Sequence, residues 1–186
     1  MATDEIGMFW DQMYAGDGYR YGRRPNAWLA QNMSRLPQAG TVLSVGDGEG
    51  RNGVWMAESG FRVTTIDASA VGVAKARDLA EARGVLVDAR VGLFPQDMAG
   101  DATYDAIVLC YVHAEPAARR RLHSAVQSRL APGGWVLLEA FTPAQLGRPS
   151  GGPQRIDLLY TAADLRVDFA SLELVHLAEE EVVLAE

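Results

Sequence analysis

The sequence predicts an α/β fold in which a mostly parallel, doubly wound sheet carries helices on both faces. Short runs rich in Val, Ile and Leu alternate along the chain with segments of helical period, a pattern typical of a parallel sheet covered by helices. The first of these runs leads directly into a glycine-rich turn and then into a helical segment. With 186 residues, 48% of them hydrophobic, the chain can bury one core without disulfides. We therefore expect residues 1–186 to form a single domain.

The N-terminal segment, residues 1–24, is expected to be irregular or only marginally helical. Aromatic rings are concentrated there, at Trp10, Tyr14, Tyr19 and Tyr21. Tyr19 and Tyr21 belong to a charged segment with glycines, which cannot form a buried helix. We therefore expect this segment to be a lid that closes over bound ligands.

The remaining elements follow from apolar periodicity and from the residues that begin and end helices. A helix is expected over Pro25–Leu36, with Trp28, Leu29 and Met33 facing inward. Strands are expected at Thr41–Val45, Arg62–Ile66, Val85–Val91, Tyr104–Cys110 and Trp135–Ala140. Between them we expect helices at Arg51–Ser59, Ala70–Arg83 and Pro116–Leu130, the last one ended by Ala-Pro-Gly-Gly at residues 131–134. The loop 142–153, rich in Gly and Pro, is expected to lie over the functional site.

Composition excludes several classes of protein. A formal net charge of −7 makes duplex nucleic acid a poor partner and favours a small molecule. Cys110 is the only cysteine, so no intramolecular disulfide can form, and no Cys/His spacing indicates zinc. The longest strongly apolar run, residues 106–112, is far shorter than the roughly 20 residues of a membrane-spanning helix. With an acidic rather than basic start, the chain is expected to be cytoplasmic and to bind no membrane.

The strongest local signal is the turn Val-Gly-Asp-Gly-Glu-Gly-Arg-Asn-Gly at residues 45–53. Glycine permits positive φ and lets a ligand lie against backbone amides at the start of a helix. Gly46, Gly48 and Gly50 give the spacing G-x-G-x-G, whereas the glycines at 48, 50 and 53 give the dinucleotide spacing G-x-G-x-x-G. Asp67 ends the second expected strand, where a carboxylate can accept hydrogen bonds from both hydroxyls of a ribose. The structural alternative is a tight turn followed by an Asp67 that caps the next helix.

Four motifs in register resemble those of class I S-adenosylmethionine-dependent methyltransferases. They are the turn at residues 42–52, Val-Thr-Thr-Ile-Asp at 63–67, Tyr-Asp-Ala-Ile-Val at 104–108, and Leu-Ala-Pro-Gly-Gly-Trp-Val-Leu-Leu-Glu at 130–139. Residues 9–11, 14, 19–26, 139–146 and 151–153 are similar to a small bacterial branch of tellurite-resistance and thiopurine-type enzymes. The resemblance covers nearly the whole chain and implies a Rossmann-like sheet.

The resemblance implies that S-adenosylmethionine is the cofactor and that a small-molecule acceptor takes its methyl group by in-line displacement. Residues at the carboxyl ends of the first strands are then expected to bind the cofactor: Gly46, Asp47, Gly48, Gly50, Asp67, Ala68, Gly92, Leu93 and Cys110. The lid and acceptor side would be formed by Trp10, Tyr14, Tyr19 and Tyr21. We expect no metal ion, no nucleic-acid partner, and a monomer or weak homodimer.

The sequence departs from the family pattern at two places. Where the family commonly has an aspartate after the third strand, for the adenine amino group, this chain has Leu93. The backbone around Gly92 or the side chain of Asp97 are the alternatives. The family also follows a sixth strand with an antiparallel seventh, whereas this chain ends soon after the expected last strand, which contains His176. A missing seventh strand would leave a sheet edge open to aggregation or dimerisation.

Two histidines carry candidate chemistry. His113 follows the fourth expected strand and is, with Tyr21, the catalytic candidate, since it could take a proton from the acceptor. The alternative is a packed or capping histidine, and a Cys110–His113 nucleophilic pair is disfavoured because no orienting third group is visible. His123 lies among Arg119, Arg120, Arg121 and Arg129, a run that we interpret as a solvated helix face rather than an RNA-binding one.

Two other functions compete with methyl transfer. An NAD-dependent oxidoreductase would use the dinucleotide spacing, but the chain has no room for a separate substrate domain and no Tyr-x-x-x-Lys pair. A non-catalytic protein that binds the cofactor and a protein partner is the other alternative, which the departure at Leu93 keeps open.

Overall fold

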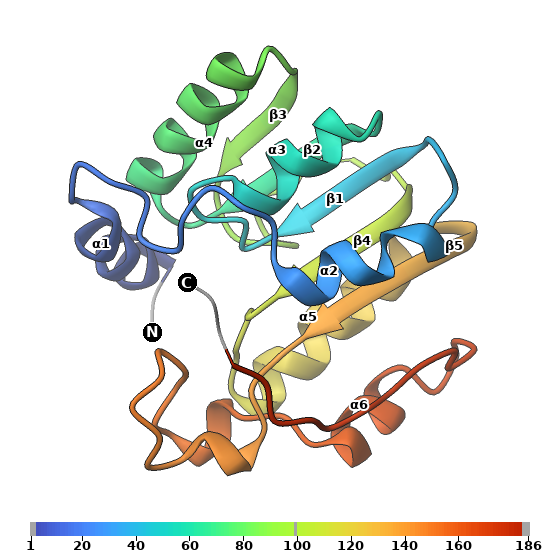
Figure 1. The fold of residues 1–186 in the computed structure, drawn as a ribbon. Helices are drawn as coiled ribbons and strands as arrows, with labels where there is room; N and C mark the ends of the chain where they lie inside the picture. The colour runs from blue at the N-terminus through green and yellow to red at the C-terminus, as the bar shows by residue number, and fades with distance from the viewer. Residues whose placement is uncertain (1–2, 99, 184–186) are drawn as a thin grey trace.

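A five-stranded sheet in the order β3-β2-β1-β4-β5 forms the centre of the structure, a computed structural model that describes residues 3–98 and 100–183 (Figure 1). The strands are β1 (Thr41–Val45), β2 (Arg62–Asp67), β3 (Val87–Val91), β4 (Tyr104–Cys110) and β5 (Leu130–Glu139), and every neighbouring pair is parallel. The order runs outward from β1 in both directions, so the carboxyl ends of β1 and β4 flank the switch point at which open α/β sheets bind ligands. The predicted doubly wound α/β fold is confirmed.

Six α-helices are described around this sheet. They are α1 (Thr3–Tyr14), α2 (Ala27–Asn32), α3 (Arg51–Glu58), α4 (Ala70–Arg83), α5 (Pro116–Ser128) and α6 (Ala162–Asp168), with short 3₁₀ helices at Met33–Arg35, Pro143–Gln145 and Ile156–Leu158. Leu29 of α2 and Met56 of α3 pack on one face of the sheet, and Val126 of α5 packs on the other. None of the described helices combines the length and apolar character needed to cross a membrane.

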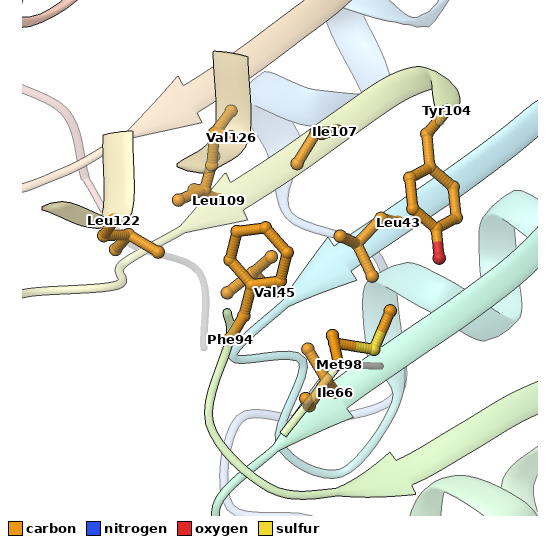
Figure 2. Packing of buried hydrophobic residues seen from close by; sticks show 10 residues of the cluster. All are labelled: Leu43, Val45, Ile66, Phe94, Met98, Tyr104, Ile107, Leu109, Leu122 and Val126. Carbon is orange, nitrogen blue, oxygen red and sulfur yellow. The ribbon is translucent and has the colours of Figure 1, made fainter. Parts of the chain in front are cut away.

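The core consists of two layers of apolar side chains, one on each face of the sheet. Because successive strand residues point to opposite faces, β4 sends Leu109 toward α5 and Val108 toward α2 and α3. The layer beneath α5 consists of Leu43, Val45, Ile66, Phe94, Met98, Tyr104, Ile107, Leu109, Leu122 and Val126 (Figure 2). Burial of each such side chain contributes roughly 1.5–3 kcal/mol, so both central strands are held firmly up to the switch point.

Several strand and helix boundaries differ from the predicted ones, most clearly at the start of the third and fifth strands and at the end of α5. The third strand begins at Val87 rather than Val85, because the amide of Val85 donates to the carbonyl of Ala80 and completes the end of α4. The fifth strand begins at Leu130, which already pairs with Tyr104 ahead of an irregularity in the register. The Ala-Pro-Gly-Gly segment expected to precede this strand therefore lies inside it, and α5 ends at Ser128.

The helix expected over Pro25–Leu36 is shorter and changes type. The side chain of Asn26 accepts a hydrogen bond from the amide of Leu29, so α2 begins after Asn26, and a 3₁₀ turn replaces it from Met33. Leu29 is fully buried and Trp28 is half-buried, both facing inward as predicted.

The first part of the N-terminal segment is a regular twelve-residue helix, α1, and the expectation of an irregular or marginal structure there was wrong. Isolated helices of this length are marginal in water, so contacts with the rest of the fold must stabilise it. Asp11 of α1 accepts hydrogen bonds from the hydroxyl of Ser69 and the amide of Val71 at the start of α4. Figure 1 shows α1 beside α4 at the carboxyl edge of the sheet. Residues 15–24 lack regular structure, as expected.

The chain beyond β5 forms the loop 142–153, then α6, and then a segment without strands up to residue 183. The expectation of a last strand around His176 was wrong, since His176 is exposed and outside any strand. Within the described residues the sheet therefore lacks the sixth strand as well as the seventh, and β5 is an edge strand.

Candidate functional site

The glycine turn after β1 presents its backbone toward the carboxyl edge of the sheet. Gly46, Gly48 and Gly50 have φ values of 64°, 55° and 90°, which side chains rarely tolerate. A Cβ on Gly48 would come within 2.5 Å of the Tyr14 hydroxyl oxygen, and one on Gly46 within 2.8 Å of Val112 Cγ2. The turn therefore depends on glycine both for its conformation and for close approach by another group.

Asp67 connects the end of β2 to this turn by hydrogen bonds. Its Oδ2 accepts from the amide of Gly48 at 2.8 Å, and its Oδ1 accepts from the amide of Ser69 at 2.8 Å. The cap of α4 is Ser69, whose hydroxyl accepts from the amide of Gly72, so the capping alternative for Asp67 is wrong. Burial raises the pKa of Asp67, although both amide bonds oppose that shift. Each carboxylate oxygen can accept a further hydrogen bond, which leaves capacity for ligand hydroxyls.

Asp47 holds the turn from inside the protein. Its carboxylate accepts from the Ser44 hydroxyl at 2.6 Å and from the amide of Gly53 in α3 at 3.1 Å. Burial raises the pKa of Asp47 to about 6 despite these bonds. The side chain thus stabilises the start of α3, and only the backbone of Asp47 remains for the cofactor contact predicted for this residue.

Glu49 is a buried acid in the turn that the sequence analysis missed. Its Oε1 lies 2.9 Å from the ammonium of Lys75 in α4, and its Oε2 accepts from the amide of Arg20 at 2.6 Å. Glu49 therefore joins the glycine turn to the segment that follows α1.

Three of the predicted lid residues form one aromatic row. Trp10 stacks on Tyr14 with a centroid separation of 5.4 Å, and Tyr14 meets Tyr21 edge-on at 6.5 Å. Tyr14 is buried against Gly48, and burial and nearby carboxylates, Asp67 first among them, raise its pKa. Tyr19 lies apart from this row, packed on the α3–α4 cluster, and its hydroxyl donates to the carbonyl of Lys75.

The residues expected near adenine lie after β2 and β3. The amide of Gly92 donates to the carbonyl of Asp67, and the amide of Leu93 donates to Oδ2 of Asp97 at 2.8 Å. The loop aspartate considered as a substitute thus lies beside Leu93. Ala68 is half-buried, and a Cβ on Gly7 of α1 would come within 2.8 Å of its carbonyl oxygen, so α1 lies directly on this stretch.

His113 is the centre of a second group of rings beyond β4. Its Nδ1 donates to the carbonyl of Leu158 at 2.6 Å, which places the proton on Nδ1 and leaves the lone pair on Nε2. Among the described residues, Nε2 accepts one long hydrogen bond of 3.4 Å, from the amide of Phe141. Burial lowers the pKa of His113 and favours the neutral ring. Its Nε2 is therefore available to accept a proton.

Aromatic side chains surround His113. Phe141 stacks on it at 5.7 Å and Tyr160 lies 5.2 Å away, both measured between ring centroids. Tyr111 stacks on Phe141 at 4.8 Å and has a φ of 59°, a strained value for a bulky residue and one often found at functional sites. Tyr111, Phe141 and Tyr160 were not predicted as site residues. Tyr111 and Phe141 meet because β4 and β5 pair up to Cys110 and Glu139, and Tyr160 joins them because the chain returns after the loop 142–153.

Cys110 lies apart from this group. Its side chain packs in the apolar layer beneath α2 and α3, and burial raises the pKa of its thiol. Because the thiolate is the reactive form, the geometry and the raised pKa both disfavour a Cys110–His113 nucleophilic pair.

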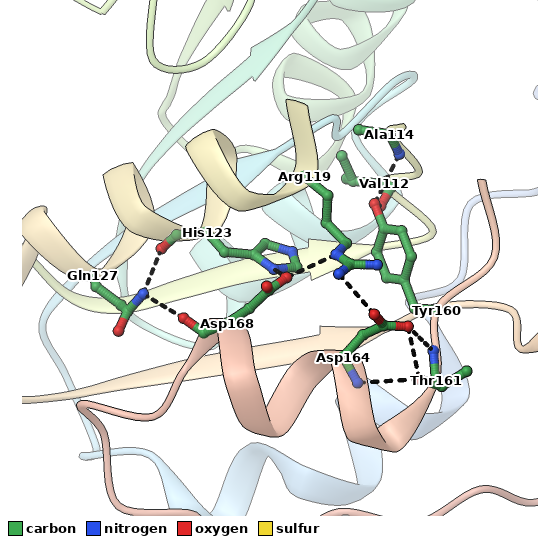
Figure 3. A network of polar contacts seen from close by, with 9 residues as sticks. All are labelled: Val112, Ala114, Arg119, His123, Gln127, Tyr160, Thr161, Asp164 and Asp168. Carbon is green, nitrogen blue, oxygen red and sulfur yellow. Dashed lines mark hydrogen bonds and ion pairs between the residues drawn. The ribbon is translucent and has the colours of Figure 1, made fainter. Parts of the chain in front are cut away.

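The interpretation of the arginine-rich part of α5 as a solvated face holds only in part. Arg120 and Arg121 are exposed, but Arg119 and His123 are buried. Arg119 Nε and His123 Nδ1 both bond Oδ2 of Asp168, at 2.7 and 2.8 Å, and so hold α6 against α5 (Figure 3). The prediction was wrong for these two residues because helical period alone did not show that α6 covers them.

Comparisons with known proteins agree with this geometry. A family model described as a methyltransferase domain matches residues 42–134, half of the chain. The ribosomal RNA small subunit methyltransferase C of Chromohalobacter salexigens is 35% identical over 121 residues, which cover 58% of this chain and 34% of that protein. TehB from Haemophilus influenzae has a TM-score of 0.67 at 16% identity, over 94% of this chain and 58% of that one. A SAM-dependent methyltransferase from Thiobacillus denitrificans, solved with S-adenosyl-L-homocysteine, has a TM-score of 0.53 at 21% identity, over 69% of this chain and 53% of that one.

These matches support different conclusions about the chain. The chain spans about a third of the length of the curated relative, and the solved structures, at their low identities, show the fold. The family model runs from β1 into β5 and so includes the glycine turn and Asp67. The chain therefore belongs to the methyltransferase-domain family, within the class I S-adenosylmethionine-dependent methyltransferases.

Proposed function

We propose that the protein transfers a methyl group from S-adenosylmethionine to a small-molecule acceptor. The observation that carries the proposal is the bond from the Gly48 amide to Asp67 Oδ2, which brings a carboxylate suited to ribose against the glycine turn at the switch point of the sheet. The positive φ angles of Gly46, Gly48 and Gly50, and the spare acceptor capacity of Asp67, suit an adenosine-containing cofactor. Asp97 beside Leu93 adds an acceptor suited to an adenine amino group.

The protein's own part in the reaction is to bind, orient and exclude water. When bound, S-adenosylmethionine supplies a methyl group whose bond to the sulfonium sulfur breaks with its electron pair going to sulfur, as the acceptor heteroatom bonds the carbon. Nε2 of His113 takes the proton that the acceptor heteroatom loses. The row Trp10–Tyr14–Tyr21 covers the turn and limits access of water.

The rings around His113 support a small acceptor with an apolar body. Phe141 and Tyr160 pack against the His113 ring and Tyr111 stacks on Phe141, and aromatic surfaces of this kind bind flat or apolar groups well. An acceptor whose heteroatom is already ionised, such as a thiolate, would need no base at all. The dependence on His113 therefore distinguishes protonated from ionised acceptors.

RNA is the second candidate acceptor, because the curated relative is named as a ribosomal RNA methyltransferase. Arg120 and Arg121 are exposed on α5, but the chain as a whole has a formal net charge of −7. A substrate of many phosphates would be repelled by that excess of acidic groups. The small-molecule acceptor is favoured for this reason.

The experiment is to measure S-adenosylhomocysteine formation with separate panels of thiol, hydroxyl and amine small molecules and with ribosomal RNA. We expect turnover with a small molecule and none above background with RNA. His113→Gln should lower kcat for hydroxyl or amine acceptors and leave thiolate acceptors nearly unchanged, with the exposed His176→Gln as control. Turnover with RNA alone would replace the proposed acceptor, and binding of the cofactor without product from any panel would favour the non-catalytic alternative.

A further inference from the structure

Lys75 is the only lysine in a chain whose Lys and Arg residues number 17. It lies in the first half of α4, and its side chain is 17% exposed. Where every other basic position carries arginine, a lysine whose ammonium is nearly buried calls for a specific geometric reason. Its contacts supply one.

The ammonium of Lys75 is surrounded by four oxygen atoms. It donates to the backbone carbonyls of Tyr14, Gly16 and Gly18, each at 2.6 Å, and it lies 2.9 Å from Oε1 of Glu49. An ammonium has three N–H groups pointing in three directions, which suits carbonyls arranged around one point. A guanidinium is planar and would direct its donors into one plane, so arginine cannot serve the same set.

These contacts fix the segment between α1 and α2. The carbonyls of residues 14, 16 and 18 are bound by Lys75, and the amide of Arg20 is bound by the other oxygen of Glu49. Because Tyr14 is the last residue of α1, this arrangement also holds its ring against Gly48. Residues 14–20 are thereby attached to both α4 and the glycine turn.

We infer that Lys75 is a positioning residue that holds residues 14–20 closed over the glycine turn and so sets the affinity of the site for an adenosine-containing ligand. The inference rests on the proposed function for the identity of that ligand. Lys75 acts through Tyr14 and Glu49 and touches neither the acceptor nor a reacting atom. Its removal should reduce the fraction of molecules in the closed arrangement, and the apparent dissociation constant rises as that fraction falls.

The experiment compares Lys75→Met and Lys75→Arg with wild type by calorimetry against S-adenosylhomocysteine and by hydrogen exchange of residues 14–20. Arg83→Met is the matched control, since Arg83 also belongs to α4 but forms a half-exposed ion pair with Glu58. We expect both Lys75 variants to bind at least about 10-fold more weakly, because a closed fraction of roughly one in ten raises the dissociation constant tenfold. Residues 14–20 should exchange faster in both variants without ligand, while Arg83→Met resembles wild type and all proteins stay folded by thermal unfolding.

Two results would overturn the inference. One is wild-type affinity and wild-type exchange of residues 14–20 in Lys75→Met, and the other is full recovery of both by Lys75→Arg. If wild type itself fails to bind S-adenosylhomocysteine, the proposed function fails, and the exchange comparison without ligand still tests Lys75.

Reductive dimethylation of the wild-type protein gives a second test if the variants do not fold. The reagent methylates amines, so Lys75 is the only side chain that reacts, and the α-amino group provides an internal reference. We expect S-adenosylhomocysteine to slow the reaction at Lys75 relative to the α-amino group, because the ligand favours the closed arrangement. Equal relative rates with and without ligand would contradict the positioning role.

Discussion

At the scale of single residues, two buried carboxylates, Asp47 and Asp67, have different roles at the glycine turn. Asp67 bonds one amide with each oxygen and keeps acceptor capacity at the carboxyl edge of the sheet. Asp47 points inward, where Ser44 and Gly53 use its oxygens to hold the start of α3. Asp67 is therefore expected to determine binding, and Asp47 to determine stability.

Asp67→Ala should weaken S-adenosylhomocysteine binding by about 1.5–3 kcal/mol, the scale of a charge-assisted hydrogen bond lost from a ligand. Calorimetry measures this, and Asp88→Ala serves as control because Asp88 is exposed on β3 and paired with Arg90. An Asp67→Ala protein that folds and binds with wild-type affinity would show that the ribose contact is wrong.

Asp47→Asn should change how stability depends on pH. Burial raises the pKa of Asp47 from 3.8 to about 6 in the folded protein, so between these values the folded state binds more protons than the unfolded chain. The free energy of unfolding contributed by Asp47 then falls as the pH rises through this window, by up to ~3 kcal/mol. Asparagine keeps one oxygen for Ser44 and Gly53 but does not titrate, so the stability of the variant relative to wild type should increase from about pH 4 to about pH 6. Urea unfolding across this range tests it, and a constant difference would contradict the prediction.

The sequence predicted the glycines and Asp67 because their roles follow from spacing along one β-turn-α-turn-β segment. Lys75 and Glu49 were not predicted as site residues, because their contact joins α4 to the glycine turn across 26 positions. Burial of Arg119 was likewise invisible, since only the packing of α6 covers it.

At the scale of elements, two short helices flank the candidate site: α1 packs beside the glycine turn, and α6 packs on α5 directly after Tyr160. Both are shorter than a helix that would be stable alone, and both depend on specific polar contacts. Asp11 holds α1 at the start of α4, and α6 begins with a capping box formed by Thr161 and Asp164. Their placement could not be predicted from periodicity because these contacts join segments distant in sequence.

Tyr160, just before α6, should control the orientation of His113. Its hydroxyl donates to the carbonyl of Val112 at 3.0 Å and accepts from the amide of Ala114 at 2.7 Å, on either side of His113 (Figure 3). Tyr160→Phe keeps the ring but frees this backbone, and a small misplacement of a reacting group lowers kcat by roughly 10-fold or more. The dissociation constant for S-adenosylhomocysteine should stay near that of wild type.

The matched control for Tyr160→Phe is Tyr104→Phe, which alters another buried tyrosine at the start of β4, far along the strand from His113. If Tyr160 acts through His113, Tyr160→Phe should cause no further loss of kcat in a His113→Gln background. An equal loss in both backgrounds would mean that Tyr160 affects turnover by another route.

At the scale of the whole molecule, the sheet order brings every candidate group to one edge. Alternating apolar runs and helices were sufficient to predict a parallel, doubly wound sheet, and the structure adds the strand order β3-β2-β1-β4-β5. The start of β5 was not predictable, because it depends on the pairing of Leu130 with Tyr104. The absence of a strand near His176 was not predictable either, because a strand forms only where the segment can pair with a neighbouring strand. The monomer or weak homodimer expected from the open edge stays a prediction.

The central claim is that the glycine turn and Asp67 form a site for S-adenosylmethionine, and calorimetry of wild type and Gly48→Val against S-adenosylmethionine, S-adenosylhomocysteine and NAD tests it most directly. A valine at position 48 would strain a φ of 55° and place its Cβ 2.5 Å from the Tyr14 hydroxyl oxygen, so both the turn and the Tyr14 ring beside it would have to move. We predict that wild type binds both sulfur-containing nucleosides and not NAD, and that a folded Gly48→Val protein binds none of the three. Tight binding of NAD alone, or wild-type affinity in Gly48→Val, would contradict the claim.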